Sequence, residues 1–142
     1  ERVGLVAVVE QEPKFVSAEE GGRLASILGA PDAKVLDVAQ RLGLGDFVAD
    51  LTSRRLASAK LSELSGGERK RLGILGGFLG GGRVLFLGET TAFLDEGTAA
   101  TVLDHIRAGF PDKTVVFFSH DPLVRRKCDA VIDLERCASP EG

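Results

Sequence analysis

A helix start at Ser65 is the feature that most constrains how this chain can fold. Ser65 is followed three residues later by Glu68 and then by an apolar run. In this spacing, called a capping box, each side chain accepts a hydrogen bond from a backbone N–H group that the first helical turn leaves without a partner. Gly66 and Gly67 carry no side chain, so an anion can approach their amides, where the helix dipole favours negative charge. The stretch therefore predicts a helix whose N-terminus can receive a phosphate group, although taken alone it fits an ordinary helix start equally well.

Short apolar runs alternate with helical patterns along the rest of the chain. We expect strands at residues 3–9, 83–87, 114–118 and 130–134, because these runs are short, apolar and rich in Val, Leu and Phe. We expect helices at 18–28, 31–42, 65–79, 95–108 and from 122 onward, with 45–56 helical or irregular. The apolar positions expected on the second of these helices are Val35, Leu36, Val38, Ala39 and Leu42. This alternation predicts an α/β fold with a mainly parallel sheet and flanking helices.

The helix that begins after Ser65 has an unfavourable composition for a helix. Leu72, Leu75 and Leu79 form one apolar stripe, but Gly73, Gly76 and Gly77 interrupt it. Each interior glycine costs about 0.5 to 1 kcal/mol relative to alanine. We therefore expect packing, rather than helix propensity, to hold this helix in place.

Composition limits the chain to one soluble domain. A length of 142 residues with 44% hydrophobic content is enough for one compact core, and a net charge of -3 gives no global attraction to nucleic acid. No apolar run reaches the roughly 20 residues needed to span a bilayer. Cys128 and Cys137 lack the spacing of a metal site, so we interpret them as isolated thiols. We expect an intracellular, soluble protein, without a distinction between cytoplasm and an organelle matrix.

Five landmarks in order resemble those of ATP-binding cassette (ABC) ATPases. Residues 64–68 (Leu-Ser-Gly-Gly-Glu) resemble the signature motif of that family. Around it, residues 8–13 are similar to the Q-loop, 84–89 to the Walker B strand, 92–95 to the D-loop and 115–121 to the switch-histidine strand. The resemblance implies a partial P-loop NTPase fold over residues 1–135, with a helical insert at 18–60, the signature helix at 61–82 and a flexible tail at 136–142.

The resemblance also implies roles for individual residues. Glu89 would polarise the attacking water, His120 would contact the γ-phosphate, and Gln11 would link the water and the metal. Asp95 would act across a dimer interface. The groups that would contact the γ-phosphate of an ATP molecule held by another cassette are Ser65, Gly66, Gly67 and Glu68. Taken singly, a histidine after a strand or a glutamate at a strand end is more often structural or solvated, and only the joint spacing favours a function.

Two departures from the family pattern argue against independent catalysis. The sequence contains no Gly-Lys dipeptide, so it has no Walker A segment to hold the α and β phosphates. Gly88 stands where the family has the aspartate that holds magnesium, and glycine supplies no oxygen ligand. We therefore expect no metal ligands in this chain, ATP bound only in trans, and no hydrolysis of ATP by the chain alone.

Three functions stay open at this stage. Residues 60–71 and 128–135 look most like the ABC-F branch, whose members work on ribosomes, so the first expectation is a degenerate cassette portion of that ancestry, serving as a structural or accessory subunit. The alternatives are a cassette that completes an ATP site in trans with a Walker A-bearing partner, and the nucleotide-binding domain of an ABC exporter. Each requires another protein chain or an N-terminal cassette half. Because the sequence has no methionine and Glu1 stands almost against the first predicted strand, we expect a processed, trimmed or partial chain.

Overall fold

The computed structural model describes residues 6–9, 28–53, 64–88 and 95–137. Its three strands, β1 (Val6–Val9), β2 (Val84–Gly88) and β3 (Thr114–Phe118), form a parallel sheet in the order β1-β2-β3. In the ladder, Phe86 pairs with Val116, and Gly88 pairs with Phe118. The predicted α/β class with a parallel sheet is thus confirmed.

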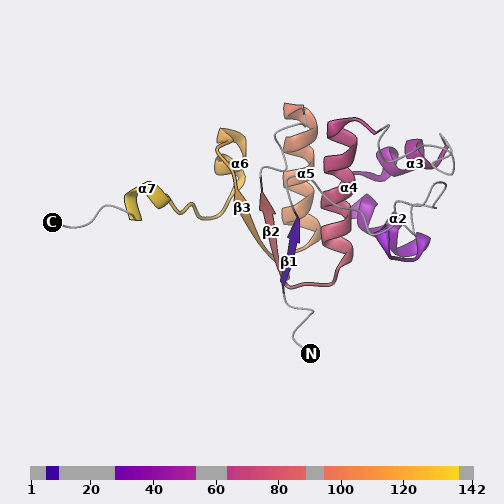
Figure 1. Cartoon of the computed structure of the whole chain (residues 1–142), viewed down its shortest axis with the longest axis horizontal. Coiled ribbons are helices and arrows are strands. Elements are labelled where there is room, and N and C mark those ends of the chain that lie inside the picture. Colours follow the sequence, from indigo (N-terminus) through magenta and orange to yellow (C-terminus); the bar gives the residue numbers. More distant parts are fainter. Residues whose placement is uncertain (1–5, 10–27, 54–63, 89–94, 138–142) are drawn as a thin grey trace.

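Helices cover one face of this sheet in two layers (Figure 1). The inner layer consists of α4 (Gly66–Leu79) and α5 (Glu96–Gly109), and the outer layer, on the far side of α4, consists of α2 (Asp32–Arg41) and α3 (Gly45–Ser53). The short helix α6 (Pro122–Lys127) packs against α5. The helices α4 and α5 thus lie between the sheet and the outer layer.

The helix α4 is buried around most of its circumference. Beyond the predicted Leu72, Leu75 and Leu79, the structure also buries Ile74 and Phe78 in the same core. Gly76 lies where an added Cβ would be 3.6 Å from Cδ2 of Leu28. This central position explains how the chain keeps a helix that contains three interior glycines, because apolar burial contributes more than those glycines cost.

The outer helix α2 is hydrogen-bonded to the C-terminal ends of both inner helices. Lys34 Nζ donates a hydrogen bond to the carbonyl of Leu79 at 3.2 Å, and Arg41 Nη2 donates to the carbonyl of Gly109 at 2.6 Å. The guanidinium carbon of Arg41 also lies 4.2 Å from the centre of the Phe110 ring. These cations satisfy carbonyls that the last helical turns leave without partners.

One of the five apolar positions expected on the second helix lies outside the core. Leu36 is 47% exposed, whereas Val35, Val38, Ala39 and Leu42 are buried. The buried positions follow the spacing of one helix face, and Leu36 lies beside that face rather than on it.

The fourth predicted strand, residues 130–134, is also wrong. Residues 130–133 lie outside any helix or strand, and Leu134 begins the short helix α7 (Leu134–Cys137). Val131 and Ile132 are 50% and 78% exposed. An apolar run becomes a strand only where a neighbouring strand offers backbone partners, and in the described part of the chain no strand pairs with this one.

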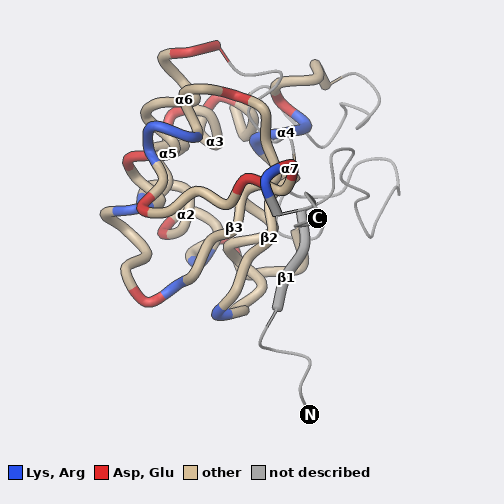
Figure 2. Tube along the Cα trace, turned by 90° about the vertical axis from the view of Figure 1, so that its left-hand side faces the viewer, with Lys and Arg blue, Asp and Glu red and all other residues tan. Residues whose placement is uncertain are grey.

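Several predictions concern residues that lie outside the described ranges. These include residues 3–5 of the first strand, residues 10–13 of the Q-loop, nearly all of the helix at 18–28, the end of the segment 45–56, residues 92–94 of the D-loop and residues 138–142 of the tail. Among the helices that the structure describes, none has the length and apolar character needed to cross a membrane. In the view of Figure 2, segments of Lys and Arg are interspersed with segments of Asp and Glu along the described trace.

Candidate functional site

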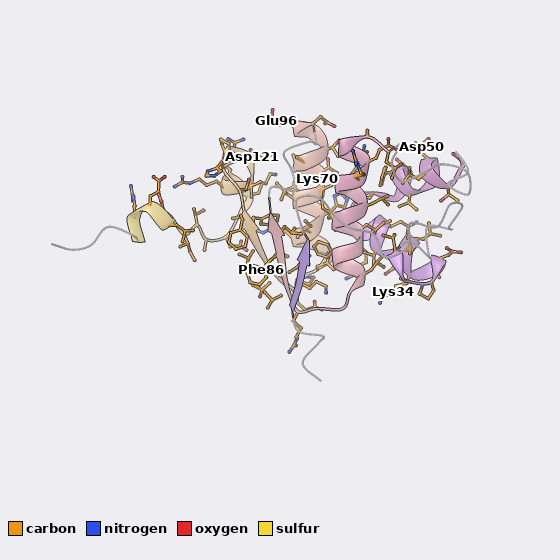
Figure 3. The ribbon with its side chains drawn as sticks, in the orientation of Figure 1. Lys34, Asp50, Lys70, Phe86, Glu96 and Asp121 are labelled. Atoms are coloured by element: carbon orange, nitrogen blue, oxygen red, sulfur yellow. The ribbon has the colours of Figure 1, made fainter. Side chains whose placement is uncertain are left out.

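Several of the residues for which the sequence predicts a function lie at one end of the molecule. The strands point toward this end, whereas α4 and α5 run in the opposite direction, so both helices begin where the strands finish (Figure 1). Figure 3 shows Lys70, Glu96 and Asp121 at this end and Lys34 near the other. Gly88 and Phe118, the last residues of β2 and β3, are ladder partners here. In open α/β sheets, ligands bind outside the carboxyl ends of the strands.

The capping box predicted at Ser65 is present. The hydroxyl oxygen of Ser65 accepts a hydrogen bond from the backbone N of Glu68 at 3.1 Å, and Glu68 Oε1 accepts one from the backbone N of Ser65 at 3.2 Å. The helix α4 therefore begins at Gly66, and a short polar turn fixes its first residues.

The first amides of α4 stay available for a ligand. Ser65 and Gly66 are exposed, and Gly67 is half-buried. Within the described residues, the backbone N–H groups of Gly66 and Gly67 have no hydrogen-bond partner. The hydroxyl of Ser65 uses its oxygen as an acceptor, so its O–H group can still donate. Three donors at the positive end of a helix dipole are able to donate hydrogen bonds to an anion.

Asp95 caps the second inner helix at the same end. Its Oδ1 accepts a hydrogen bond from the backbone N of Thr98 at 2.9 Å, and its Oδ2 accepts one from Thr98 Oγ1 at 2.6 Å. The side-chain bond from Thr98, followed by the backbone bond from the same residue, lowers the pKa of Asp95 below its usual value. Asp95 is exposed, so its ionised carboxylate remains accessible from solvent while it caps α5.

His120 lies in a turn at the carboxyl end of β3. Its side chain is exposed. The turn is fixed on both sides, because Ser119 Oγ accepts a hydrogen bond from the backbone N of Asp121 at 3.0 Å, and Asp121 Oδ1 accepts one from the backbone N of Leu123 at 2.8 Å. The structure thus places His120 at the same end as Ser65 and Asp95. Glu89 and Gln11 lie outside the described residues, and their roles stay predictions.

The structure also shows a cavity at this end that sequence reasoning missed. Its volume is about 530 Å³, and its walls come from the α2–α3 loop and from the first halves of α3, α4 and α5. Phe47, Arg71 and Asp95 line it. Arg71 Nε donates a hydrogen bond to the carbonyl of Gly67 at 3.2 Å, and its guanidinium carbon lies 4.4 Å from the centre of the Phe47 ring. Arg71 therefore joins α3 to the first turn of α4.

Gly88 has room for a side chain. A Cβ added there would meet no atom within 4 Å. Glycine at this strand end is therefore not required by packing, and it supplies no ligand for a cation. Within the ranges that the structure describes, no group of three or more His, Cys, Asp or Glu side chains is placed to hold a metal ion.

The sequence is similar to proteins of ABC transporters. It is 30% identical over 136 residues to the Beta-(1-->2)glucan export ATP-binding/permease protein NdvA of Rhizobium meliloti, which covers 92% of this chain and 23% of that protein. It is 30% identical over 121 residues to a Probable ABC transporter ATP-binding/permease protein of Haemophilus influenzae, with 82% of this chain and 21% of that protein covered. This chain thus spans less than a quarter of the length of these relatives. No protein-family model matches the sequence.

The fold is similar to that of a solved transporter structure. A bacterial Atm1-family ABC exporter with ATP bound matches 83% of this chain and 21% of its own, with a TM-score of 0.68 and 24% sequence identity. The chain therefore has the α/β fold of part of an ABC ATPase.

Proposed function

We infer that this chain is part of an ABC ATPase domain, and that the N-terminus of α4 binds the terminal phosphate of an ATP molecule held by another polypeptide segment. One observation carries the inference: the capping box at Ser65 leaves the amides of Gly66 and Gly67 unpaired at an exposed helix start. Backbone donors and a helix dipole at such a start favour an anion. The location of this helix start agrees with the inference, because α4 begins at the carboxyl end of the sheet, where ligands of α/β proteins bind (Figure 1).

The residues present fit one part of the nucleotide only. Ser65, Gly66 and Gly67 can donate hydrogen bonds to the γ-phosphate. Glu68 stabilises the first turn of α4 by accepting a hydrogen bond from the backbone amide of Ser65. The α and β phosphates need a glycine-rich loop followed by Gly-Lys, and the sequence has none. A Walker A-bearing segment outside this sequence must therefore bind most of the nucleotide. ATP bound in trans would supply the phosphoanhydride bond that is hydrolysed.

The proposal also includes the catalytic roles that the resemblance to ABC ATPases implies for Glu89, His120 and Gln11. In the sequence, Glu89 directly follows Gly88, the last residue of β2, and His120 comes two residues after Phe118, the ladder partner of Gly88. Asp95 is ionised and exposed at the start of α5, where a second chain can reach it. Gln11 is assigned only through its position in the sequence. We do not assign magnesium to this chain, because Gly88 offers no oxygen ligand.

The transporter alternative is favoured over ABC-F ancestry. The relatives named above are an export ATP-binding/permease protein and a probable ABC transporter protein, and the structural neighbour is an exporter. Nothing in these comparisons points to a ribosome. A partner of this chain is accordingly proposed to be a transporter polypeptide, either a second cassette or the cassette half that this sequence lacks.

A structural role is the second candidate. Gly88 supplies no ligand atom, and the packing around it does not require glycine. The helix α4 also contains interior glycines, which lower helix stability and have no role in catalysis. Both features are those of a cassette whose catalytic demands have relaxed. In that case the chain stabilises a larger assembly without contributing to turnover.

A single substitution separates the two candidates. We propose to identify the polypeptides that co-purify with the chain, to assemble it with a Walker A-bearing polypeptide among them, and to measure ATP turnover. Ser65→Arg should lower the rate by about 100-fold or more, because a long cation blocks donors that bind the γ-phosphate. The control is Ser53→Arg, an equal change at an exposed position at the end of α3. An unchanged rate with Ser65→Arg in an intact assembly would establish the structural role instead, and a ribosome as the co-purifying partner would restore the ABC-F reading.

A further inference from the structure

The function proposed above makes no use of the cavity between α3, α4 and α5. The volume of this cavity is about 530 Å³, which is within the range of small-molecule sites. It lies at the end of the molecule where α4 and α5 begin (Figure 1). The buried side chains of Leu44, Phe47 and Val102 form part of its wall. In a cavity with such apolar walls, a few polar groups determine which ligand binds.

Arg71 supplies a cationic group to this cavity. Its Nε donates a hydrogen bond to the carbonyl of Gly67 at 3.2 Å, and its guanidinium carbon lies 4.4 Å from the centre of the Phe47 ring. These two contacts hold the guanidinium in place. In the described part of the chain, its Nη groups have no hydrogen-bond or ion-pair partner. A guanidinium held in this way presents two parallel donors that match a carboxylate.

Two carboxylates line the same cavity. Asp46 lies in the first turn of α3, and Asp95 caps α5. Both residues are exposed, so a ligand can reach them from solvent. Among the described residues, neither carboxylate forms an ion pair with Arg71, and that of Asp46 accepts no hydrogen bond. Charges of opposite sign therefore share one cavity without contact between them.

A ligand with a single charge does not suit this arrangement. The two carboxylates would repel a simple anion placed at Arg71, and the guanidinium would repel a simple cation placed at Asp46. A zwitterion can place its anionic group at Arg71 and its cationic group at Asp46, so that each charge meets its opposite. The protein groups are held in position before binding, which lowers the entropic cost of binding such a ligand.

We propose that this cavity binds a short zwitterionic peptide of two or three residues with apolar side chains. Its C-terminal carboxylate binds the Nη groups of Arg71, and its α-ammonium group binds the carboxylate of Asp46. A single amino acid carries both charges on one carbon, whereas Arg71 and Asp46 lie on different helices and are not in contact. An extended peptide separates its termini by roughly 3.3 to 3.6 Å per residue. The apolar side chains of the peptide pack against Leu44 and Val102.

The proposed peptide site is separate from the proposed phosphate site. The peptide contacts the Nη groups of Arg71 and the first turn of α3, whereas the phosphate contacts Ser65 and the first amides of α4. Binding of the peptide requires no nucleotide and no second polypeptide. The two proposals can therefore fail independently of each other.

An NMR titration of the full chain with the tripeptide Ala-Leu-Ala tests the proposal. Backbone amide shifts of the residues that line the cavity should change and saturate, with a Kd of about 1 mM or below. N-acetylation of the peptide removes its cation, and C-terminal amidation removes its anion. Each modification should weaken binding by about tenfold or more, because hydrogen bonds between charged partners are the strong ones. Leucine alone should also bind at least about tenfold more weakly, since it cannot bridge the two groups.

Two variants assign each end of the peptide to its protein partner. Asp46→Asn should weaken binding of Ala-Leu-Ala by about tenfold and leave binding of the N-acetylated peptide unchanged. Arg71→Gln should weaken binding of Ala-Leu-Ala similarly and leave that of the amidated peptide unchanged. The control is Asp32→Asn, the same exchange in the first turn of α2, outside the lining of the cavity. If Arg71→Gln does not fold, Asp46→Asn with the N-acetylated peptide still decides the question.

Four outcomes would overturn the proposal. The first is the absence of saturable shifts at the cavity with up to about 10 mM peptide. The second is equal binding of the free peptide and its N-acetylated or amidated form, which would show that the charges are not recognised. The third is binding of leucine as tight as that of the tripeptide, which would identify an amino-acid site. The fourth is equal weakening by Asp46→Asn and Asp32→Asn, which would show a general effect of charge.

Discussion

Asp95 and Thr98 are joined twice, through the backbone amide and the hydroxyl of Thr98, at 2.9 and 2.6 Å. Both bonds favour the ionised carboxylate and lower its pKa from the usual 3.8. The stabilisation of α5 by Asp95 should therefore be fully present above pH 3.8 and be lost as the pH falls through the lower pKa of the folded chain.

Thr98→Val should raise the pKa of Asp95 toward 3.8, because it removes the hydroxyl donor and keeps the side-chain shape. Titration of the Asp95 carboxyl carbon by NMR measures the shift. Thr101→Val is the control, since the Thr101 hydroxyl bonds the carbonyl of Gly97 instead. An unmoved pKa in Thr98→Val would show that this hydroxyl is not the main cause.

Gly76→Ala should stabilise the fold. Gly76 lies in the interior of α4, and the new methyl group would meet Leu28 at an ordinary contact distance of 3.6 Å. Removing a helical glycine should contribute about 0.5 to 1 kcal/mol to the free energy of unfolding, measured with urea. Gly81→Ala should instead destabilise the chain by about 1 to 2 kcal/mol, because Gly81 has φ +69°. A loss of stability in Gly76→Ala would mean that α4 packs more tightly there than the structure shows.

Local signals allowed much of this fold to be predicted. The helix starts predicted at residues 65, 95 and 122 depend on residues within a few positions of one another. The structure has all three, capped by Ser65, Asp95 and Asp121. Short apolar runs likewise predicted β2 and β3. These features are specified by residues that are neighbours in the sequence, so rules of periodicity and helix capping can predict them.

Features that depend on distant residues could not be predicted. Residues 130–134 have a strand sequence, but whether such a run forms a strand is decided by a neighbouring strand. The contact of Arg71 with Phe47 joins two helices whose packing the sequence pattern does not reveal. Its only sequence signal is that Arg71 stands four residues after Gly67, on the same side of α4.

Leu75→Ala should cost about 2 to 5 kcal/mol of unfolding free energy. Leu75 is 0% exposed and belongs to the main core, so its loss leaves a cavity between the sheet and the outer helices. Leu36→Ala makes the same change at a residue that is 47% exposed, and should stay within about 0.5 kcal/mol. Chemical denaturation of both variants checks the contrast. Similar losses in the two would contradict the packing of α4 described above.

Arg71→Lys should weaken the attachment of α3 to α4. Lysine keeps the charge but has neither the planar group that lies over Phe47 nor the Nε that bonds Gly67. We expect a loss of about 0.5 to 1 kcal/mol in the free energy of unfolding. Arg69→Lys is the matched control, because Arg69 is exposed on the first turns of the same helix. Equal effects of the two substitutions would show that charge alone matters at position 71.

The last prediction concerns ATP and position 88. The chain alone should bind magnesium-ATP too weakly to detect by calorimetry, because its donors can contact only the terminal phosphate and the sequence has no Gly-Lys. Gly88→Asp should fold normally, since a Cβ there meets no atom within 4 Å, and its stability should change by less than about 0.5 kcal/mol.

Gly88→Asp should nevertheless fail to create ATP binding in the isolated chain. A carboxylate at position 88 can hold part of the magnesium shell, but it cannot hold the α and β phosphates, so the two missing functions are independent. Micromolar binding by the unmodified chain that survives Glu89→Gln but disappears with Ser65→Arg would show that no second polypeptide is needed. Binding gained by Gly88→Asp alone would show that the missing carboxylate, rather than the missing phosphate loop, limits this chain.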